Sequence, residues 1–191
     1  PSTKLCAVVK ANAYGHGAVE VAKEAAAAGV DFFAVALPQE GIELREAGIT
    51  QPIVVLGILL PKVAPLVVKY NLSYAVFDEE RLMALNDAAL AQHTKAKVHI
   101  VVDTGMHRIG LHVSAAGAFA AKAAKLPGIE VEGMFSHFAT ADGEKKDYAA
   151  YQYQRFLTAA GEIEKQDVHI HHGVRKFTDY VKHQIKSNLN H

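Results

Sequence analysis

Two hydrophobic periods alternate along the chain. Short continuous apolar runs, the first at residues 5–9, are typical of strands buried on both faces. Segments with apolar residues at helical spacing lie between these runs. We predict seven strands, at 5–9, 32–37, 52–57, 74–77, 98–102, 129–135 and 168–171. We predict helices at 18–28, 38–47, 59–70, 79–90, 114–126 and 147–164, with Asp78 and Ser114 as N-caps.

A predicted helix separates each strand from the next. Strands that are buried on both faces and joined by helices form a parallel sheet covered by helices. An open doubly wound sheet and a (β/α) barrel both satisfy this order. No GxGxxG turn follows the first strand, and the regular repeat favours the barrel. A complete barrel usually needs about 250 residues. We therefore expect an α/β fold, a (β/α) TIM-type barrel that is incomplete at about seven of eight units.

Composition narrows the functional classes. The chain has 191 residues, of which 50% are hydrophobic, enough for a packed core. Twenty Lys and Arg balance twenty Asp and Glu, so the net charge favours neither nucleic acid nor an anionic membrane as a partner. Trp is absent and aromatic residues are only 8%, which also argues against a surface that stacks on nucleic-acid bases. The single cysteine, Cys6, excludes an internal disulfide framework. No apolar run reaches the roughly 18 residues that span a bilayer. We expect a soluble, cytoplasmic protein.

Barrel enzymes carry their active sites at the carboxyl ends of the strands, and four residues there are candidates. Lys10 follows the first strand and could act as a Schiff-base nucleophile, or simply extend to solvent. Tyr14 could bind a ligand ring or pack in the turn. Arg108, in a loop with two glycines, could bind an anion or a phenolate, or pair with Asp103. His137 could orient a ring or move a proton, or be a core histidine.

Two further features lie near the end of the sequence. His169 and His171 would share one face of the last strand and could bind a metal. No carboxylate stands at ligand spacing from them or from His172, so we predict no metal site. Residues 173–191 are basic and carry apolar residues at helical spacing. A helix that binds a membrane or partner and a solvated helix that packs on its own domain both fit this pattern.

Three segments together resemble the alanine racemase family of pyridoxal-phosphate (PLP) enzymes. They are residues 7–17 (AVVKANAYGHG), 103–110 (DTGMHRIG) and 137–142 (HFATAD), in the family's order and spacing, and residues 52–57 are also similar. The resemblance covers residues 1–172, which we expect to form a PLP-binding barrel domain. Residues 173–191 are then an unmatched basic tail.

The resemblance implies an isomerase that interconverts L- and D-alanine through a Schiff base and transfer of the Cα proton. It implies that Lys10 holds PLP and serves as one of two catalytic bases. The other cofactor-binding residues it implies are Tyr14 at the phosphate, Arg108 at the phenolic oxygen and His137 at the pyridine ring, with Val8 and Leu56 lining the pocket. It further implies an amino-acid substrate, a homodimer for the full-length protein and a role in supplying D-alanine to the cell wall. A non-catalytic PLP-binding barrel and an inactive fragment are the alternatives.

The sequence departs from the family's pattern at several points. Many members carry a lysine, modified to a carbamate that orients the arginine, where this chain has Val101. The family's Asn-Ser phosphate-binding segment is replaced by residues 173–176 (GVRK). The opening helix, the final barrel strand and the C-terminal domain, whose tyrosine is the second base, have no counterpart in the sequence. We therefore expect a barrel fragment that is weakly active or inactive alone.

Overall fold

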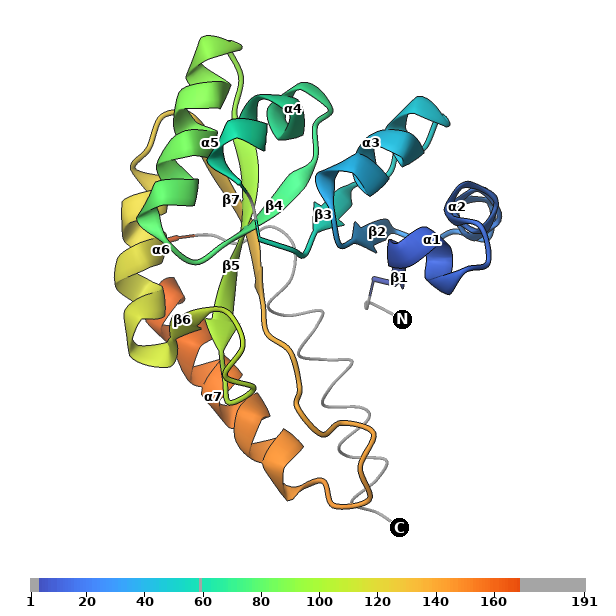
Figure 1. The fold of residues 1–191 in the computed structure, drawn as a ribbon. Coiled ribbons are helices and arrows are strands. Elements are labelled where there is room, and N and C mark those ends of the chain that lie inside the picture. The colour runs from blue at the N-terminus through green and yellow to red at the C-terminus, as the bar shows by residue number, and fades with distance from the viewer. Residues whose placement is uncertain (1–3, 59, 169–191) are drawn as a thin grey trace. The chain divides into compact units, whose positions relative to one another are not determined.

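The computed structural model describes residues 4–58 and 60–168, and Figure 1 shows the path of the chain. These residues divide into two units. The N-terminal unit contains Lys4–Val98 and Pro127–Glu130, and the C-terminal unit contains His99–Leu126 and the described residues from Val131 onward. Two strands, β5 (Ala96–Asp103) and β7 (Ile129–Phe135), begin in the N-terminal unit and end in the C-terminal unit.

Parallel strands form the core of the N-terminal unit. They are β1 (Cys6–Val8), β2 (Phe32–Val35), β3 (Ile53–Val55) and β4 (Ser73–Val76). They pair in sequence order, with Val8 opposite Ala34, Ala34 opposite Val54 and Val54 opposite Ser73. The strands are short and rich in β-branched and aromatic residues, and most of β2 to β4 is buried. This burial on both faces is the reason their sequences are apolar throughout instead of alternating.

Helices follow each of these strands. They are α1 (Lys10–Tyr14), α2 (Ala18–Ala27), α3 (Pro38–Glu46), α4 (Ala64–Lys69) and α5 (Glu79–Ala91), with a 3₁₀ turn η1 (Pro61–Val63) before α4. The predicted N-cap Asp78 is confirmed, since its side chain accepts the backbone N–H of Arg81 at 3.0 Å. The predicted helix at 59–70 becomes regular only from Ala64. Pro65 has no N–H to donate, so it fits the first turn of a helix and not its interior.

The C-terminal unit adds β6 (Leu111–His112), the 3₁₀ turn η2 (Val113–Ala115), α6 (Ala116–Ala124) and α7 (Asp147–Glu164). Strand β6 pairs in parallel with β5, and β7 also pairs with β5. Helices α6 and α7 pack against each other (Figure 1). The expectation that a helix separates every pair of strands is wrong for β5 and β6, which only a loop connects. Ser114 is not an N-cap: it lies inside η2, and its N–H donates to Nδ1 of His112 at 3.4 Å.

Several predictions concern residues beyond the described ranges. Of the predicted strand at 168–171 only Val168 is described, and the boundary at 172 and the basic tail at 173–191 lie outside the described residues. Among the helices of residues 4–58 and 60–168, none is long and apolar enough to cross a membrane.

Candidate active site

Lys10 opens an unusual turn at the carboxyl end of β1. Its side chain is half-buried, and it lies two residues after Val8, the end of the strand. The next four residues, Ala11 to Tyr14, have φ angles between 51° and 55°. They therefore form a left-handed turn, a conformation that costs roughly 1–2 kcal/mol for each residue with a side chain. Because none of the four is glycine, tertiary contacts must hold this turn in place.

Glu40, in the first turn of α3, holds the start of this turn. Its Oε1 accepts the backbone N–H of Ala11 at 2.6 Å. Its Oε2 accepts the N–H groups of Ala36 and Leu37 at 2.7 and 2.9 Å. Hydrogen bonds to a charged group contribute about 1.5–3 kcal/mol each. One carboxylate therefore joins the residue after Lys10 to the segment that follows β2.

Asn12 holds the other end of the turn. Its side-chain Oδ1 accepts the N–H of Ala18, the first residue of α2, at 2.7 Å. Its backbone carbonyl accepts the N–H of Gly17 at 3.0 Å. These contacts satisfy donors at the start of α2 that have no partner within the helix. The left-handed turn thus ends in a fixed connection to α2.

Exposed apolar side chains surround this edge of the N-terminal unit. Val8 is 41% exposed and Leu56 is half-buried. The pairing register and the alternation along strands place both on one face of the sheet, because Val8 is level with Val54, two residues before Leu56. Tyr14, in the same turn as Lys10, is 61% exposed. The four predicted site residues of this unit therefore lie at the carboxyl ends of β1 and β3, with β2 between these two strands.

Arg108 lies in a loop that Asp103 organises from the end of β5. One oxygen of Asp103, Oδ1, accepts the N–H groups of Gly105, Met106 and His107 at 2.9–3.0 Å. Its Oδ2 lies 3.2 Å from Nδ1 of His107. Partial burial alone would raise the pKa of Asp103, but these backbone donors and the charge of His107 lower it below its ordinary value.

The side chain of Arg108 itself is exposed. Although both residues are within the described ranges, no ion pair joins Arg108 to Asp103, so that alternative interpretation is wrong. The carboxylate is committed to the backbone of its own loop. The guanidinium of Arg108 is therefore exposed to solvent, and Asp103 does not neutralise its charge.

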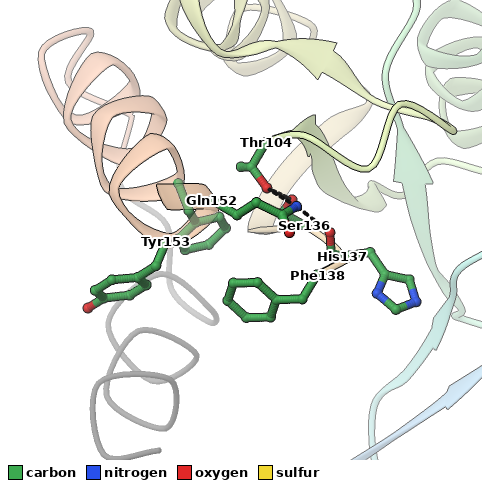
Figure 2. Close-up of a pocket in the computed structure, with 7 residues that line it drawn as sticks. Thr104, Ser136, His137, Phe138, Gln152 and Tyr153 are labelled. Carbon is green, nitrogen blue, oxygen red and sulfur yellow. Dashed lines mark hydrogen bonds between the residues drawn. The ribbon is translucent and has the colours of Figure 1, made fainter. Parts of the chain in front are cut away.

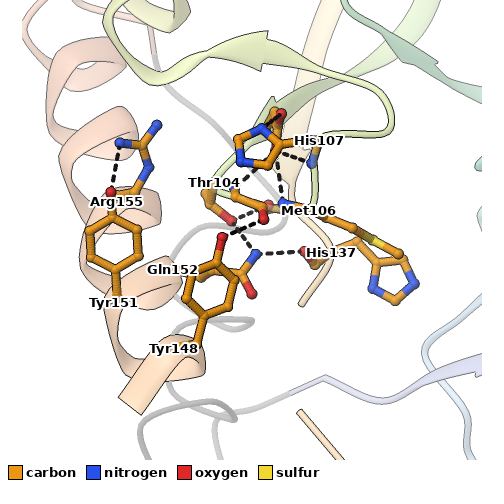
Figure 3. A network of polar contacts seen from close by, with 11 residues as sticks. Thr104, Met106, His107, His137, Tyr148, Tyr151, Gln152 and Arg155 are labelled. Carbon is orange, nitrogen blue, oxygen red and sulfur yellow. Dashed lines mark hydrogen bonds and ion pairs between the residues drawn. The ribbon is translucent and has the colours of Figure 1, made fainter. Parts of the chain in front are cut away.

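Gln152 of α7 connects this loop to the one that carries His137 (Figure 3). The side chain is completely buried. Its Nε2 donates to Oγ1 of Thr104 at 3.2 Å and to the carbonyl of His137 at 3.1 Å. Its Oε1 accepts the N–H of Ala139 at 2.9 Å. Thr104 also bonds Ser136, with 2.7 Å between the two hydroxyl oxygens. One amide therefore fixes the segments that follow β5 and β7.

The exposed ring of His137 points away from α7, as Figure 2 shows. A cavity of about 10 Å³ lies between α7 and the ends of β5 and β7, and it is lined by Thr104, Ser136, His137, Phe138, Gln152, Tyr153 and Phe156. This volume admits a single water molecule at most. The cavity is therefore a packing gap behind the two loops and cannot receive a cofactor.

Comparison with known proteins decides the family. The family model for the alanine racemase N-terminal domain matches residues 1–174. The chain belongs to the alanine racemase N-terminal domain family.

Individual relatives agree with this family. The alanine racemase of Halothermothrix orenii is 44% identical over 169 residues, which are 88% of this chain and 45% of the relative. The alanine racemase of Symbiobacterium thermophilum is 46% identical over 160 residues, 84% of this chain and 42% of the relative. A structure of alanine racemase from Clostridium difficile 630 in complex with cycloserine superposes with a TM-score of 0.86 at 39% identity, covering 90% of this chain and 47% of that one. The chain thus spans about half the length of the curated relatives it matches.

The predicted fold class and the predicted resemblance are confirmed by these similarities. The chain has the α/β fold of the family's TIM-like barrel and spans part of it. Val101, where many racemases were expected to carry lysine, is buried within β5. The side chain at this position is therefore part of the packed strand and offers nothing that could bond to Arg108.

The sequence analysis missed two residues that organise the candidate site. Glu40 follows Pro38 by two residues in a first helical turn, a position where a carboxylate is typical of a capping box. Gln152 lies among the buried residues of α7, which are otherwise apolar or aromatic. A polar side chain on an apolar helix face is the signal that could have identified it.

Other candidate chemistry is weaker. Burial raises the pKa of the Cys6 thiol to about 12, so it is not a nucleophile at neutral pH. In residues 4–58 and 60–168, no group of three or more His, Cys, Asp or Glu could hold a metal ion. His169, His171 and His172 lie outside the described residues.

Proposed function

We propose that the chain is the cofactor-binding part of a PLP-dependent racemase that interconverts L- and D-alanine. The observation that carries this proposal is Lys10, a half-buried lysine at the carboxyl end of β1 in a chain of the alanine racemase family. Barrel enzymes carry their chemistry at this end of the strands. The left-handed turn after Lys10 is held by hydrogen bonds to the side chains of Glu40 and Asn12, and the apolar side chains of Val8 and Leu56 lie at the same edge of the sheet.

The residues present fit PLP by their chemistry. Lys10 offers a primary amine for the aldehyde of the cofactor. Arg108 offers a guanidinium, not paired with Asp103, for the phenolic oxygen. Tyr14 would contact the phosphate and His137 the pyridine ring. Val8 and Leu56, the apolar residues that share a face of the sheet, would line the pocket and exclude water.

PLP, when bound, supplies an electron sink that makes the Cα–H of an amino acid acidic. Lys10 would take or return this proton on one face of the substrate. Inverting the centre needs a second base on the opposite face of the substrate. We propose that the whole protein supplies this base, and that it acts as a homodimer in the cytoplasm. The product would be D-alanine for the cell wall. Cycloserine, found in the complex of the Clostridium difficile 630 racemase, would then compete with alanine for this site.

Borohydride trapping in the presence of PLP tests the assignment of Lys10. Mass spectrometry should locate the reduced adduct on Lys10 of the full chain. Lys10→Ala should abolish this adduct, whereas Lys23→Ala, which removes an exposed amine from α2, should leave it unchanged. An adduct on a different side chain, or no adduct, would overturn the proposal.

Exchange of the α-proton of L-alanine in deuterated water separates the alternatives. Exchange that depends on both PLP and Lys10 supports a racemase. A Lys10 adduct without any exchange supports a PLP-binding barrel that has no turnover alone. We expect the isolated chain to turn over far more slowly than the roughly 10 per second of a typical enzyme.

A further inference from the structure

We infer that Glu40 is the positioning residue for Lys10: its carboxylate fixes the left-handed turn that presents the lysine to the cofactor. This inference rests on the proposed function. It concerns a residue in the helix that follows the next strand, β2, and its carboxylate contacts the backbone of Ala11 rather than the lysine side chain.

The hydrogen bonds of Glu40 are divided between two segments. Among residues 4–58 and 60–168, Oε1 accepts only the N–H of Ala11, at 2.6 Å, and Oε2 accepts the N–H groups of Ala36 and Leu37, at 2.7 and 2.9 Å. The second pair lies at the start of α3 and serves as a helix cap. The first bond reaches 29 residues back along the chain and serves only the turn after Lys10.

The turn needs this support because its conformation is unfavourable locally. Four consecutive residues with side chains, Ala11 to Tyr14, take left-handed angles. The bond from Ala11 lies at the first of these residues, directly after Lys10, so it fixes the direction in which the chain leaves the strand. Without it, the left-handed turn can relax and carry the Lys10 amine away from its place at the strand end.

Only a carboxylate of this length satisfies all three donors. A glutamine has one acceptor oxygen, which can keep the Ala36 and Leu37 bonds, but its NH₂ group would then face the N–H of Ala11. An aspartate keeps the charge but is one methylene shorter and cannot reach both segments. Glu40→Gln and Glu40→Asp therefore both break the link to Ala11, and only the second keeps the negative charge.

The test measures the turn and the cofactor separately in the full chain. Hydrogen exchange of the Ala11 amide, followed by NMR without PLP, reports on the turn. Borohydride trapping of Lys10 over a series of PLP concentrations reports on positioning. Glu43→Gln is the matched control, because Glu43 is exposed on the same helix and the substitution removes the same charge.

We expect Glu40→Gln and Glu40→Asp to speed exchange at Ala11 about tenfold, the effect of losing one hydrogen bond to a charged group. We expect them to raise the PLP concentration for half-maximal trapping by about fivefold or more. Glu43→Gln should change neither value. Trapping curves for both Glu40 variants that match the control overturn the role of Glu40 and leave the proposed function intact. A wild-type chain with no Lys10 adduct overturns the proposed function and this role together.

Discussion

Replacing Gln152 by leucine should loosen the two loops that carry Arg108 and His137. The substitution keeps an apolar fit in α7 but removes three hydrogen bonds, at 2.9, 3.1 and 3.2 Å. A neutral hydrogen bond contributes about 0.5–1.5 kcal/mol net. Thr104 keeps its bond to Ser136, and the exposed residues His137 and Ala139 can regain water as a partner. We therefore expect a loss of about 2 kcal/mol in the free energy of unfolding, near the lower end of the sum for three bonds.

Urea unfolding followed by circular dichroism measures this loss. With a typical dependence of about 2 kcal/mol per molar urea, the midpoint should fall by about 1 M. Gln154→Leu is the matched control, because Gln154 is exposed on the same helix, and it should change stability by less than about 0.5 kcal/mol. Equal midpoints for the two variants would refute the reasoning, since they would mean that the buried amide does not hold the loops.

Three other perturbations test the C-terminal unit. Gly110 has φ of 119°, and an added Cβ would lie 2.6 Å from the backbone nitrogen of Asp103, so Gly110→Ala should destabilise the fold by about 2 kcal/mol or more. Gly161→Ala is the control, because Gly161 lies in open space on α7, and it should stabilise the fold by about 0.5–1 kcal/mol. Equal shifts of the two variants in thermal unfolding would contradict this geometry. The pKa of Asp103 is lower in the folded state, so its charge stabilises the fold above the unfolded pKa of about 3.9, and this contribution is lost as the pH falls through the folded pKa. Asp103→Asn should therefore flatten the loss of stability as the pH falls below about 5, and urea midpoints that keep the wild-type dependence on pH would argue against this role. His99 and Glu132 form a buried pair, with 3.0 Å between Nε2 of the histidine and Oε2 of the glutamate. Changing either residue to leucine should lower the free energy of unfolding by about 3 kcal/mol, and changing both should lower it by clearly less than the sum of the two single losses. A double-mutant cycle in which the two losses add would exclude coupling between them.

Hydrophobic periodicity predicts much of this fold. The helix expected at 147–164 has those bounds in the structure, and the strand expected at 129–135 is β7. Both are long enough for a period to be read from the sequence. Strand β6 has two residues and carries no period, so no pattern could predict it.

The left-handed turn after Lys10 could not be predicted for a different reason. Local preference opposes it at Ala11, Ala13 and Tyr14, although the asparagine at position 12 tolerates it, and long-range hydrogen bonds, such as that from Ala11 to Glu40, determine it. Glycines at positions 15 and 17 indicate a turn, but they follow the strained residues instead of occupying their positions.

The candidate site shows the same limit. The positions of Lys10, Arg108 and His137 at strand ends follow from the order of strands and helices alone. The hydrogen-bond partners of Asp103 could not be predicted in this way, because its carboxylate could bond either to the backbone of the loop that follows it or to Arg108 in that loop. In the structure three backbone N–H groups donate to one carboxylate oxygen, so the loop backbone, and not Arg108, is the partner of Asp103.

The two units use one arrangement to fix their loops. Glu40, from the helix after β2, bonds to the segments that follow β1 and β2. Gln152, from the helix after β7, bonds to the segments that follow β5 and β7. In both cases a single side chain with several hydrogen-bonding positions joins two strand ends that are paired directly in the sheet. The candidate cofactor residues Lys10 and His137 are exposed or half-buried and lie beside these joined segments, so their positions depend on polar groups that would never touch the cofactor. Loss of either polar group should therefore weaken binding while every candidate ligand residue remains present.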